Sequence, residues 1–385
     1  MKKTMTNFNK IHKRTNTNSL KWDLTENELP MWVADMDFQT APPIQKTIKE
    51  KAEFGIYGYT IIPNQYYQAY INWWKENYQI QMKKENLIYS IGVMPSISSI
   101  IRTLTQKNDQ ILIQTPVYNV FFNVIEKNKR KIIENPLDYK NGKYNINFKD
   151  LEEKLSHEKT KLMLLCNPHN PIGKIWNKEE LIKIKELTQK HNVTVISDEI
   201  HCDLTDPQKQ YLPYASIDDD AITCIAPTKT FNIAGIQSSI IHTKKYKKQI
   251  QEQIYIDDSG QANYFAIDAT IEAYTHGKPW LEQLKKYIYN NKQITKKYLE
   301  KEIPEIKLVA SDATYLLWLD CSKLNITSEK LSKKLQKNQG LYLTPGAIFG
   351  KNGDQFLRMN IACPQETLKK GLKKLKEGII KIQET

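Results

Sequence analysis

The sequence predicts an α/β fold: a large domain with a mostly parallel central sheet flanked by helices, joined to a smaller α+β domain. Two observations predict it. From about residue 85 onward, short apolar runs alternate with amphipathic helical patterns, which is typical of a parallel sheet. Farther along, a long helical pattern at residues 281–303 precedes an apolar strand pattern at residues 315–319, which fits a smaller α+β unit.

The chain is long enough for two such domains. It has 385 residues, of which 40% are hydrophobic, so a sizeable core can form. It contains no Gly/Ser-rich linker, which indicates that the domains pack closely. We expect residues 46–280 to form the large domain, and residues 1–45 together with 281–385 to form the small one.

The first α/β unit begins at residues 87–90, an apolar run that predicts a strand. Gly92 and then Pro95 follow it, and proline suits the first turn of a helix. The apolar residues behind this proline have the i, i+3, i+4, i+7 spacing of one buried helical face: Ile97, Ile100, Ile101 and Leu104. The unit therefore places a helix N-terminus directly after a strand.

The second unit begins with a predicted strand at residues 161–166. The Pro-, Asn- and Gly-rich residues 167–173 that follow it predict a loop. Asn177, with Glu180 three residues later, is typical of a capping pair and predicts a helix that runs to about His191.

The third unit contains a β-branched strand pattern at residues 193–197, which ends at Asp198 and Glu199. Ligands of open α/β sheets bind at the carboxyl ends of the strands. Because strand side chains alternate between faces, only one of these two carboxylates can face such a ligand.

The net charge of +13 allows a nucleic-acid-binding protein as one interpretation. We favour a solvated, lysine-rich surface, because the lysines are spread over several predicted helices and no helix-turn-helix pattern precedes the α/β units. No apolar segment approaches the length of a membrane span. We therefore expect neither nucleic acid nor a membrane as a partner.

The cysteines form no C-x-x-C pair, so neither a zinc site nor a disulfide framework is expected, and we predict no metal site. They lie far apart, at Cys166, Cys202, Cys224, Cys321 and Cys363. The basic first residues are followed by polar ones rather than by the apolar core of a secretion signal. A reduced, cytoplasmic setting fits best.

One lysine has unusual surroundings. Lys229 follows a strand pattern at residues 221–225, and a lysine just past a strand end can lie in a crevice of the sheet and condense with an aldehyde. In a chain so rich in lysine, a surface position would be the ordinary interpretation. The residues that accompany Lys229 favour the chemical one.

Pyridoxal phosphate (PLP), an aldehyde cofactor that is bound through a lysine, needs several partners at once. Its ring nitrogen needs a buried carboxylate, for which Asp198 is the candidate and Glu199 the rival. Its ring oxygen needs hydrogen-bond donors, and Asn170 and His201 are placed to supply them. Alone, each of these residues would more often be a helix cap, a turn former or a structural histidine.

The sequence also offers candidates for three further groups that PLP and its substrate require. The cofactor phosphate needs backbone amides at a helix N-terminus, which the turn of Gly92, Val93 and Met94 provides. Tyr118 follows a strand and could stack on the ring, although a core aromatic is the plain alternative. Arg358 lies inside an apolar strand pattern and could bind a substrate carboxylate through its planar fork, the alternative being a structural ion pair.

Together these segments resemble the aminotransferase class I/II proteins of PLP fold type I, and most closely the cystathionine β-lyase (C-S lyase) subgroup of the MalY/PatB type. The matching stretches run in family order from about residue 22 to 364. They are residues 31–38, 57–59, 115–118, 166–173 with Trp176, 197–201, 228–232, 315–320 and 358–362. Each stretch is modest alone, but the ordered set is specific.

The resemblance implies how PLP would be held. Lys229 would be the Schiff-base lysine, and Asp198 would pair with the ring nitrogen. Asn170 and His201 would lie near the ring oxygen, and Tyr118 would stack on the ring. The phosphate would lie at Gly92, Val93, Met94 and Thr228.

The resemblance also implies how the substrate and a second subunit would be placed. Arg358, with Asn170, would bind the substrate carboxylate. The protein would be a homodimer with shared active sites, in which Tyr59 reaches toward the neighbour's phosphate. Lys229, Asp198 and Tyr59 are thus the candidate catalytic residues.

Three positions depart from the broad aminotransferase pattern. Ile172 stands where threonine is usual in the loop, and Ala226 stands where many relatives have a phosphate-binding serine. Gln237 stands where many aminotransferases have a phosphate-binding arginine, which the lyase subgroup commonly lacks as well. Phosphate binding would then depend on Thr228, the helix amides and the neighbour's Tyr59.

The reaction that the resemblance implies is α,β-elimination on L-cystathionine or another S-substituted L-cysteine, which yields a thiol, pyruvate and ammonia. Two alternatives stay open. An aminotransferase would use the same residues on the same fold, and a regulatory protein of this fold would bind a partner, because fold alone does not determine function.

Overall fold

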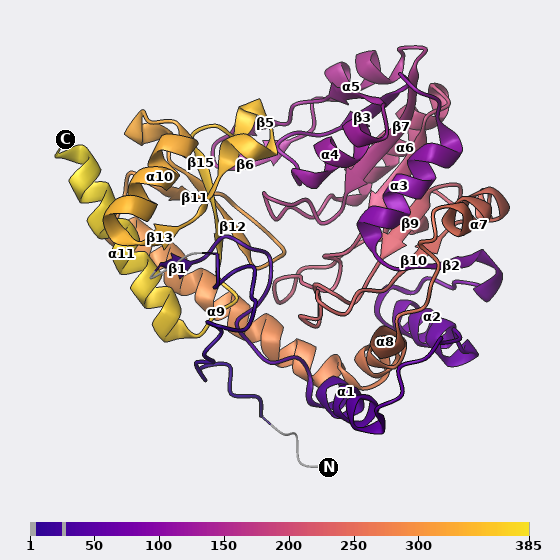
Figure 1. Cartoon of the computed structure of the whole chain (residues 1–385). Coiled ribbons are helices and arrows are strands. Elements are labelled where there is room, and N and C mark those ends of the chain that lie inside the picture. The colour runs from indigo at the N-terminus through magenta and orange to yellow at the C-terminus, as the bar shows by residue number, and fades with distance from the viewer. Residues whose placement is uncertain (1–4, 25–27, 385) are drawn as a thin grey trace.

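The computed structural model describes residues 5–24 and 28–384. Its centre is a seven-stranded sheet with the order β2-β10-β9-β8-β7-β3-β4 (Figure 1). Its strands are β2 (Leu87–Ser90), β3 (Gln110–Ile113), β4 (Lys131–Glu134), β7 (Thr160–Cys166), β8 (Thr194–Asp198), β9 (Ile222–Ile225) and β10 (Ser239–His242). Neighbours pair in parallel except at β10, which is antiparallel to both β2 and β9. The expected mostly parallel sheet is confirmed.

Helices cover both faces of this sheet. Along β7, Leu162 and Leu164 belong to one apolar cluster, whereas Met163 and Leu165 belong to another, as the alternation of a strand requires. The first cluster includes buried residues of α3 (Val93–Leu104), α4 (Val120–Lys127) and α7 (Lys247–Ile256). The second includes α5 (Phe148–Leu155) and α6 (Lys178–Lys190). The strands are therefore buried on both sides.

Three more helices pack together beside β2, and α8 (Tyr264–His276) contacts both of the others. These are α1 (Pro42–Phe54) and α2 (Asn64–Tyr78). Their aromatic residues form part of the largest apolar cluster, which also takes in Phe231, two residues after Lys229. The lysine-bearing segment is thus packed against the helical layer.

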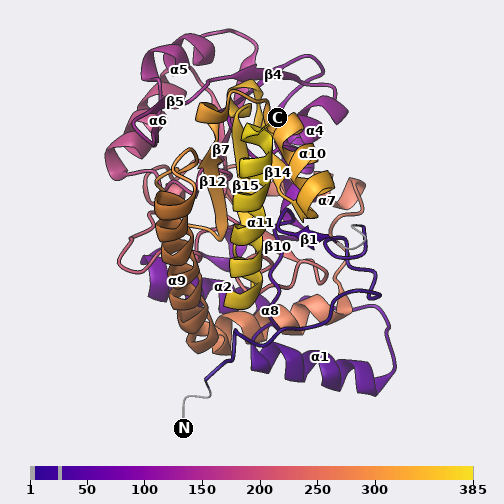
Figure 2. The same cartoon turned by 90° about the vertical axis from the view of Figure 1, so that its left-hand side faces the viewer.

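The C-terminal part contains a four-stranded antiparallel sheet with the order β11-β12-β15-β14. Its strands are β11 (Lys307–Leu308), β12 (Leu316–Asp320), β14 (Thr344–Pro345) and β15 (Phe356–Asn360). The helices of this part are α9 (Lys278–Glu302), α10 (Ser328–Gln339) and α11 (Gln365–Gln383). Figure 2 shows α9 and α11 side by side.

The N-terminal segment is attached to this C-terminal part, because β1 (Leu29–Pro30) pairs in parallel with β13 (Leu341–Tyr342). This pairing agrees with the idea that residues 1–45 and 281–385 form one unit. The domain boundaries themselves stay a prediction, and residues 1–4, 25–27 and 385 lie outside the described part.

A hairpin and five short 3₁₀ helices complete the described part of the chain. The hairpin joins β5 (Asp138–Lys140) to β6 (Lys143–Asn145). The 3₁₀ helices are η1 (Lys84–Asn86), η2 (Tyr214–Ser216), η3 (Ser322–Leu324), η4 (Gly346–Phe349) and η5 (Lys351–Gly353). None of the described helices is long and apolar enough to cross a membrane.

The local predictions hold closely. The side chain of Asn177 accepts a hydrogen bond from the amide of Glu180, and the Glu180 side chain accepts one from the amide of Asn177, so the capping box at the start of α6 is complete. The long helix starts three residues earlier than predicted, at Lys278, because Gly277 and Pro279 already suit its first turn.

Candidate active site

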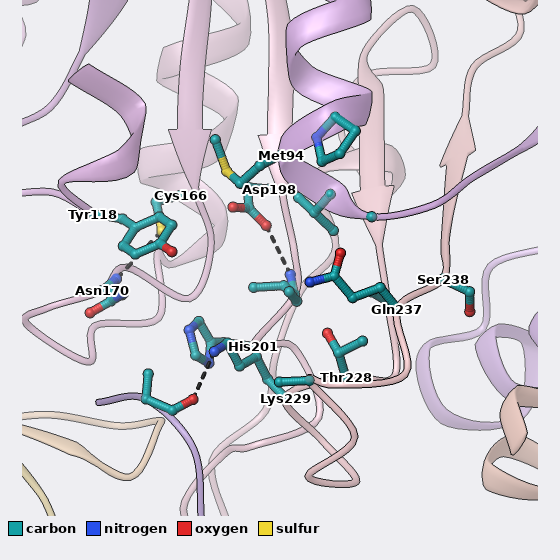
Figure 3. Close-up of a pocket in the computed structure, with 17 residues that line it drawn as sticks. Met94, Tyr118, Cys166, Asn170, Asp198, His201, Thr228, Lys229, Gln237 and Ser238 are labelled. Carbon is teal, nitrogen blue, oxygen red and sulfur yellow. Dashed lines mark hydrogen bonds between the residues drawn. The ribbon is translucent and has the colours of Figure 1, made fainter. Parts of the chain in front are cut away.

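A cavity of about 170 Å³ lies where β7, β8 and β9 end (Figure 3). Its lining includes every candidate cofactor residue except Tyr59: Gly92, Val93, Met94, Tyr118, Asn170, Asp198, His201, Thr228 and Lys229. The other residues of the lining are Ala34, Pro95, Cys166, Ile200, Ala226, Ala234, Gln237 and Ser238. The fold thus brings together segments that are spread over some 200 positions, at the edge of the sheet where ligands are expected.

The structure distinguishes the two neighbouring carboxylates. Asp198, the last residue of β8, lines the cavity and accepts a hydrogen bond from the amide of Ile200 over 3.1 Å. Glu199 is turned away, and its carboxylate accepts hydrogen bonds from Ser197 Oγ and from the amide of Tyr214, each over 2.9 Å. Burial raises the pKa of Asp198 to about 7, against the opposing effects of the hydrogen bond from Ile200 and of the nearby Lys229 charge.

The amine of Lys229 lies at the same cavity and donates a hydrogen bond to the carbonyl of Ala34 over 2.7 Å. Burial lowers the pKa of Lys229 to about 8, and the nearby Arg358 adds to this effect. The negative charges of Asp35 and Asp198 oppose it. A substantial fraction of this amine is therefore neutral near physiological pH, which is the nucleophilic and basic form.

Asn170 and His201 both line the cavity; in Figure 3, Asn170 lies next to Tyr118 and His201 lies next to Lys229. Burial lowers the pKa of His201 to about 3, so its ring is neutral near physiological pH. Its Nδ1 is buried without a hydrogen-bond partner in the described structure. Asn170 lies on the loop after β7, and its Oδ1 accepts a hydrogen bond from Arg358. Tyr118 lines the wall beside Asn170, and burial raises its pKa, so it keeps its proton.

The N-terminus of α3 forms another wall. Gly92 is the N-cap, and no side chain in the described ranges caps the amides of the first turn, which begins at Val93 and Met94. A Cβ atom built on Gly92 would lie 3.3 Å from Oε1 of Gln237, so glycine keeps the space between helix and glutamine open. Uncapped amides at a helix N-terminus beside a cavity suit an anion. Thr228 lies in the same cavity.

Arg358 lies in the middle of β15 and is only 6% exposed. Its Nη1 donates to Asn170 Oδ1 over 3.2 Å, and its Nη2 donates to the carbonyl of Trp32 over 3.0 Å. Its Nε is buried and has no partner among the described residues. The guanidinium lies over the Phe349 ring, 4.8 Å from its centroid. Burial lowers its pKa to about 10. No ion pair to Arg358 occurs in the described part of the chain, and its two hydrogen-bond partners are neutral oxygens. The structure therefore does not support the alternative of a structural ion pair.

Tyr59 lies outside the cavity of its own chain. Its side chain is fully exposed, and it belongs to a stretch with four other exposed apolar residues: Phe54, Ile56, Tyr57 and Ile61. A continuous apolar stretch of this kind is typical of a surface that another protein covers.

Two backbone groups and one side chain of the site were not singled out from the sequence. The carbonyl of Ala34 accepts hydrogen bonds from Lys229 and from the hydroxyl of Tyr315, and the carbonyl of Trp32 accepts one from Arg358. Residues 31–38 and 315–320 carry family-like motifs, so they were visible as matching stretches. Their contacts were not, because a backbone carbonyl has no sequence signature.

Comparison with known proteins places the chain. The model of the family described as aminotransferase class I and II matches residues 21–375. The chain is 39% identical to cystathionine beta-lyase PatB of Bacillus subtilis, covering 97% of this chain and 100% of PatB. It is 30% identical to Protein MalY of Escherichia coli, over 96% of this chain and 97% of MalY.

A solved structure agrees with these relatives. The PLP-bound C-S lyase from Staphylococcus hominis superposes with a TM-score of 0.92 at 33% identity, over 97% of this chain and 98% of that one. The α/β architecture is therefore the one expected from the sequence. The chain belongs to the aminotransferase class I and II family, and within it to the group of PatB and MalY.

Proposed function

We propose that this protein is a PLP-dependent carbon–sulfur β-lyase that cleaves L-cystathionine or other S-substituted L-cysteines to a thiol, pyruvate and ammonia. The observation that carries the proposal is one cavity with the Lys229 amine, the buried Asp198 carboxylate and, at its border, a guanidinium without an acidic partner in the described structure. The relatives named as cystathionine and C-S lyases support the choice of reaction.

The residues fit PLP on grounds of their own. The buried Asp198 carboxylate is suited to the protonated ring nitrogen, and the unpartnered Nδ1 of His201 and the amide of Asn170 are suited to the ring oxygen. The uncapped first turn of α3 is suited to the phosphate, with Thr228 beside it. Tyr118 would cover one face of the ring.

When bound, PLP supplies an aldehyde that takes up the substrate amine and a ring that withdraws electrons from Cα. Lys229 then moves the Cα proton, because its lowered pKa of about 8 lets the neutral amine accept a proton near neutral pH. Asp198 holds the proton on the ring nitrogen. The thiolate leaves from Cβ, and water converts the remaining three-carbon fragment to pyruvate and ammonia.

Arg358 orients the substrate. Its Nη1 and Nη2 are tied to Asn170 and to Trp32, and its other N–H groups are available for a carboxylate. Binding the α-carboxylate there would give the buried guanidinium the counter-charge that it lacks. Asn170 would contribute to the same carboxylate.

A homodimer with shared sites is part of the proposal. The exposed apolar stretch around Tyr59 supports it, since it places five large apolar side chains in water, at the end of α1 and in the loop after it. In the dimer, Tyr59 would act at the neighbour's phosphate, where this chain has Gln237 instead of an arginine. A cytoplasmic setting is supported by the five buried, unpaired cysteines.

The reaction with cystathionine or an S-alkyl-cysteine, with no 2-oxo acid added, tests the proposal. A lyase releases pyruvate, ammonia and thiol over many turnovers. An aminotransferase stalls after one turnover with its cofactor in the amine form, and it resumes only when a 2-oxo acid is added. Both reactions begin with removal of the Cα proton and differ in the step that follows, so the number of turnovers distinguishes them. A single turnover that resumes only with a 2-oxo acid would make transamination the main activity.

A further inference from the structure

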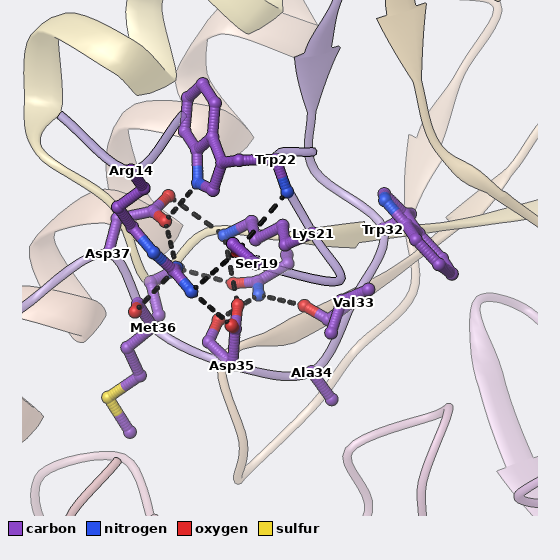
Figure 4. Close-up of polar contacts among 12 residues, drawn as sticks. Arg14, Ser19, Lys21, Trp22, Trp32, Val33, Ala34, Asp35, Met36 and Asp37 are labelled. Atoms are coloured by element: carbon purple, nitrogen blue, oxygen red, sulfur yellow. Dashed lines mark hydrogen bonds and ion pairs between the residues drawn. The ribbon is translucent and has the colours of Figure 1, made fainter. Parts of the chain in front are cut away.

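Outside the cavity, four charged side chains form a compact cluster that we call the N-terminal clasp: Arg14, Lys21, Asp35 and Asp37 (Figure 4). Arg14 bridges the two acids, with Nη2 2.7 Å from Asp35 Oδ2 and Nη1 2.7 Å from Asp37 Oδ1. Lys21 Nζ lies 2.9 Å from Asp37 Oδ2 and 3.6 Å from Asp35 Oδ1. Two cations and two carboxylates thus balance one another.

Lys21 and Asp37 are the most deeply buried members of the clasp. The Lys21 side chain is 1% exposed and that of Asp37 is 7% exposed. Asp37 also accepts a hydrogen bond from the Trp22 indole over 2.9 Å, so both of its oxygens are paired. Buried charges are tolerated only when paired and hydrogen-bonded, and removing one partner leaves the rest uncompensated. The geometry of the clasp is therefore tightly determined.

The clasp holds one end of a segment that we call the strap, residues 31–37. The strap presents its backbone to the active site, where Ala34 accepts from Lys229 over 2.7 Å and from Tyr315 over 3.0 Å. The Trp32 carbonyl accepts from Arg358 over 3.0 Å. Two charged groups of the proposed reaction are thus bonded to carbonyls of one short segment.

The strap itself lacks regular structure, and backbone hydrogen bonds hold its two ends, Met31 to Tyr342 and Asn360, and Asp37 to Ala362. Between these ends its position depends on side-chain contacts. The amide group of Asn360 donates to the carbonyls of Val33 and Asp35, and Asn232 bonds the amide and the carbonyl of Met36. These contacts tie the strap to both parts of the molecule. The clasp adds an attachment to residues 14–22, which contribute nothing to the cavity lining.

We propose that Arg14, Lys21 and Asp37 are positioning residues of the active site: by locking the strap, they hold the Ala34 and Trp32 carbonyls where these orient the Lys229 amine and the Arg358 guanidinium. The inference rests on the proposed function for the roles of Lys229 and Arg358. It assigns to residues 14–22 a part in the site, although none of them lines the cavity.

Asp35 links the clasp to Lys229 in a second way. Its negative charge raises the pKa of Lys229, against the effect of burial. If the clasp loosens, both the carbonyl that receives the amine and the carboxylate that tunes it shift together. A disturbed clasp should therefore change the titration of the site as well as its geometry.

The test compares Lys21→Met with a matched control, Lys292→Met, in the cofactor-loaded full chain. Lys292 Nζ lies 2.7 Å from both oxygens of Asp206, and the two side chains are 6% and 9% exposed, so this pair is about as buried as that of Lys21 and Asp37. It does not touch the cavity. For each variant, one measures the melting temperature, the hydrogen exchange of the peptide 31–38, the pH titration of the cofactor's visible absorption, and kcat and KM.

Lys21→Met should speed exchange of the strap amides at least tenfold, shift the pH midpoint of the visible band, and raise KM. Lys292→Met should leave all three within twofold of wild type, even where it lowers the melting temperature as much. Unchanged strap exchange and titration in Lys21→Met, or equal changes in both variants, would overturn the proposal.

A second variant covers the case in which Lys21→Met does not fold. Arg14→Lys keeps the charge but has one amine in place of Nη1 and Nη2, so it cannot reproduce the two separate 2.7 Å contacts and should produce the same changes in smaller measure. Wild-type exchange and titration in this variant would count against the clasp. Strap exchange does not depend on which reaction is catalysed. If the protein showed no lyase activity, the proposed function would fail while the clasp could still be tested.

Discussion

Arg358 Nη1 donates a hydrogen bond to Oδ1 of Asn170 over 3.2 Å, although 188 positions separate the two residues. The contact joins β15 of the antiparallel sheet to the loop after β7 of the central sheet. The border of the cavity is therefore built from both parts of the molecule, and a bound carboxylate at Arg358 would connect them further.

Replacing Arg358 with lysine should impair substrate binding. Lysine keeps a positive charge but loses the planar fork, so the bonds to Asn170 and Trp32 cannot be kept together with a bidentate carboxylate contact. We expect a loss of about 2–5 kcal/mol of transition-state binding, measured as kcat/KM on S-substituted cysteines. The cofactor band should persist. A kcat/KM equal to that of wild type would remove the role assigned to Arg358.

The attachment point of the cofactor can be mapped directly. The purified protein should be yellow, and borohydride should abolish the visible band by fixing the cofactor to a lysine. Because Lys229 is the lysine that lines the cavity, peptide mapping should place the adduct there. Lys229→Ala should give no reduced adduct. An adduct on another lysine would refute the assignment.

Tyr59 should act across the dimer interface, since its side chain is fully exposed in its own chain. Inactive Lys229→Ala and inactive Tyr59→Ala subunits should regain activity when mixed, because each heterodimer would contain one site with both residues intact. Activity is measured after heterodimers are shown to form, for instance with two affinity tags. Formation without recovery would indicate that Tyr59 serves its own subunit or neither.

Asp198 should make the cofactor-free protein less stable as pH rises. Its folded pKa of about 7 lies above that of an unfolded aspartate, so between about pH 4 and 7 the folded state holds a proton that the unfolded chain has lost. Stability from this group is present below pH 4 and is lost through pH 7. In the Asp198→Asn variant, the side-chain amide does not titrate, so this loss should disappear.

The measurement is the free energy of unfolding of Asp198→Asn minus that of wild type. This difference should grow by about 2.6 kcal/mol between pH 5 and pH 8. Taking the difference cancels the buried histidines His169 and His201, whose lowered pKa values act in the opposite direction. A difference that is flat with pH would show that Asp198 ionises normally in the folded protein.

The sequence was most informative where the physics is local. The strand 87–90 matches β2, and the capping box at Asn177 matches the start of α6. The alternation of side chains along β8 predicted that one of Asp198 and Glu199 would face the ligand, and the cavity contains Asp198 alone of the two. The residues that line the cavity lie together at the strand ends, because parallel strands bring their carboxyl ends to one edge of the sheet.

Non-local features were out of reach. Ser239–His242 has the same apolar character as its neighbours, so nothing in it marks β10 as the antiparallel strand; direction depends on which strands pair with it. Residues 31–37 were visible in the sequence as a family-like motif, but the role of the motif was not. Its carbonyls bind Lys229 and Arg358, which lie far along the chain. The role proposed for Tyr59 concerns a second subunit, which a single chain does not contain.

The strap also has a consequence for biosynthesis. Asn360, which bonds the carbonyl of Asp35, lies 325 positions later in the chain. At translation rates of about 5–20 residues per second, roughly 16–65 s pass between the appearance of the two on the ribosome. Throughout that time the strap, which is synthesised before the rest of the site, lacks its contact with Asn360. A chain released before Arg358 is added would therefore lack both its guanidinium and an ordered strap, and could not acquire a complete site however long it waited.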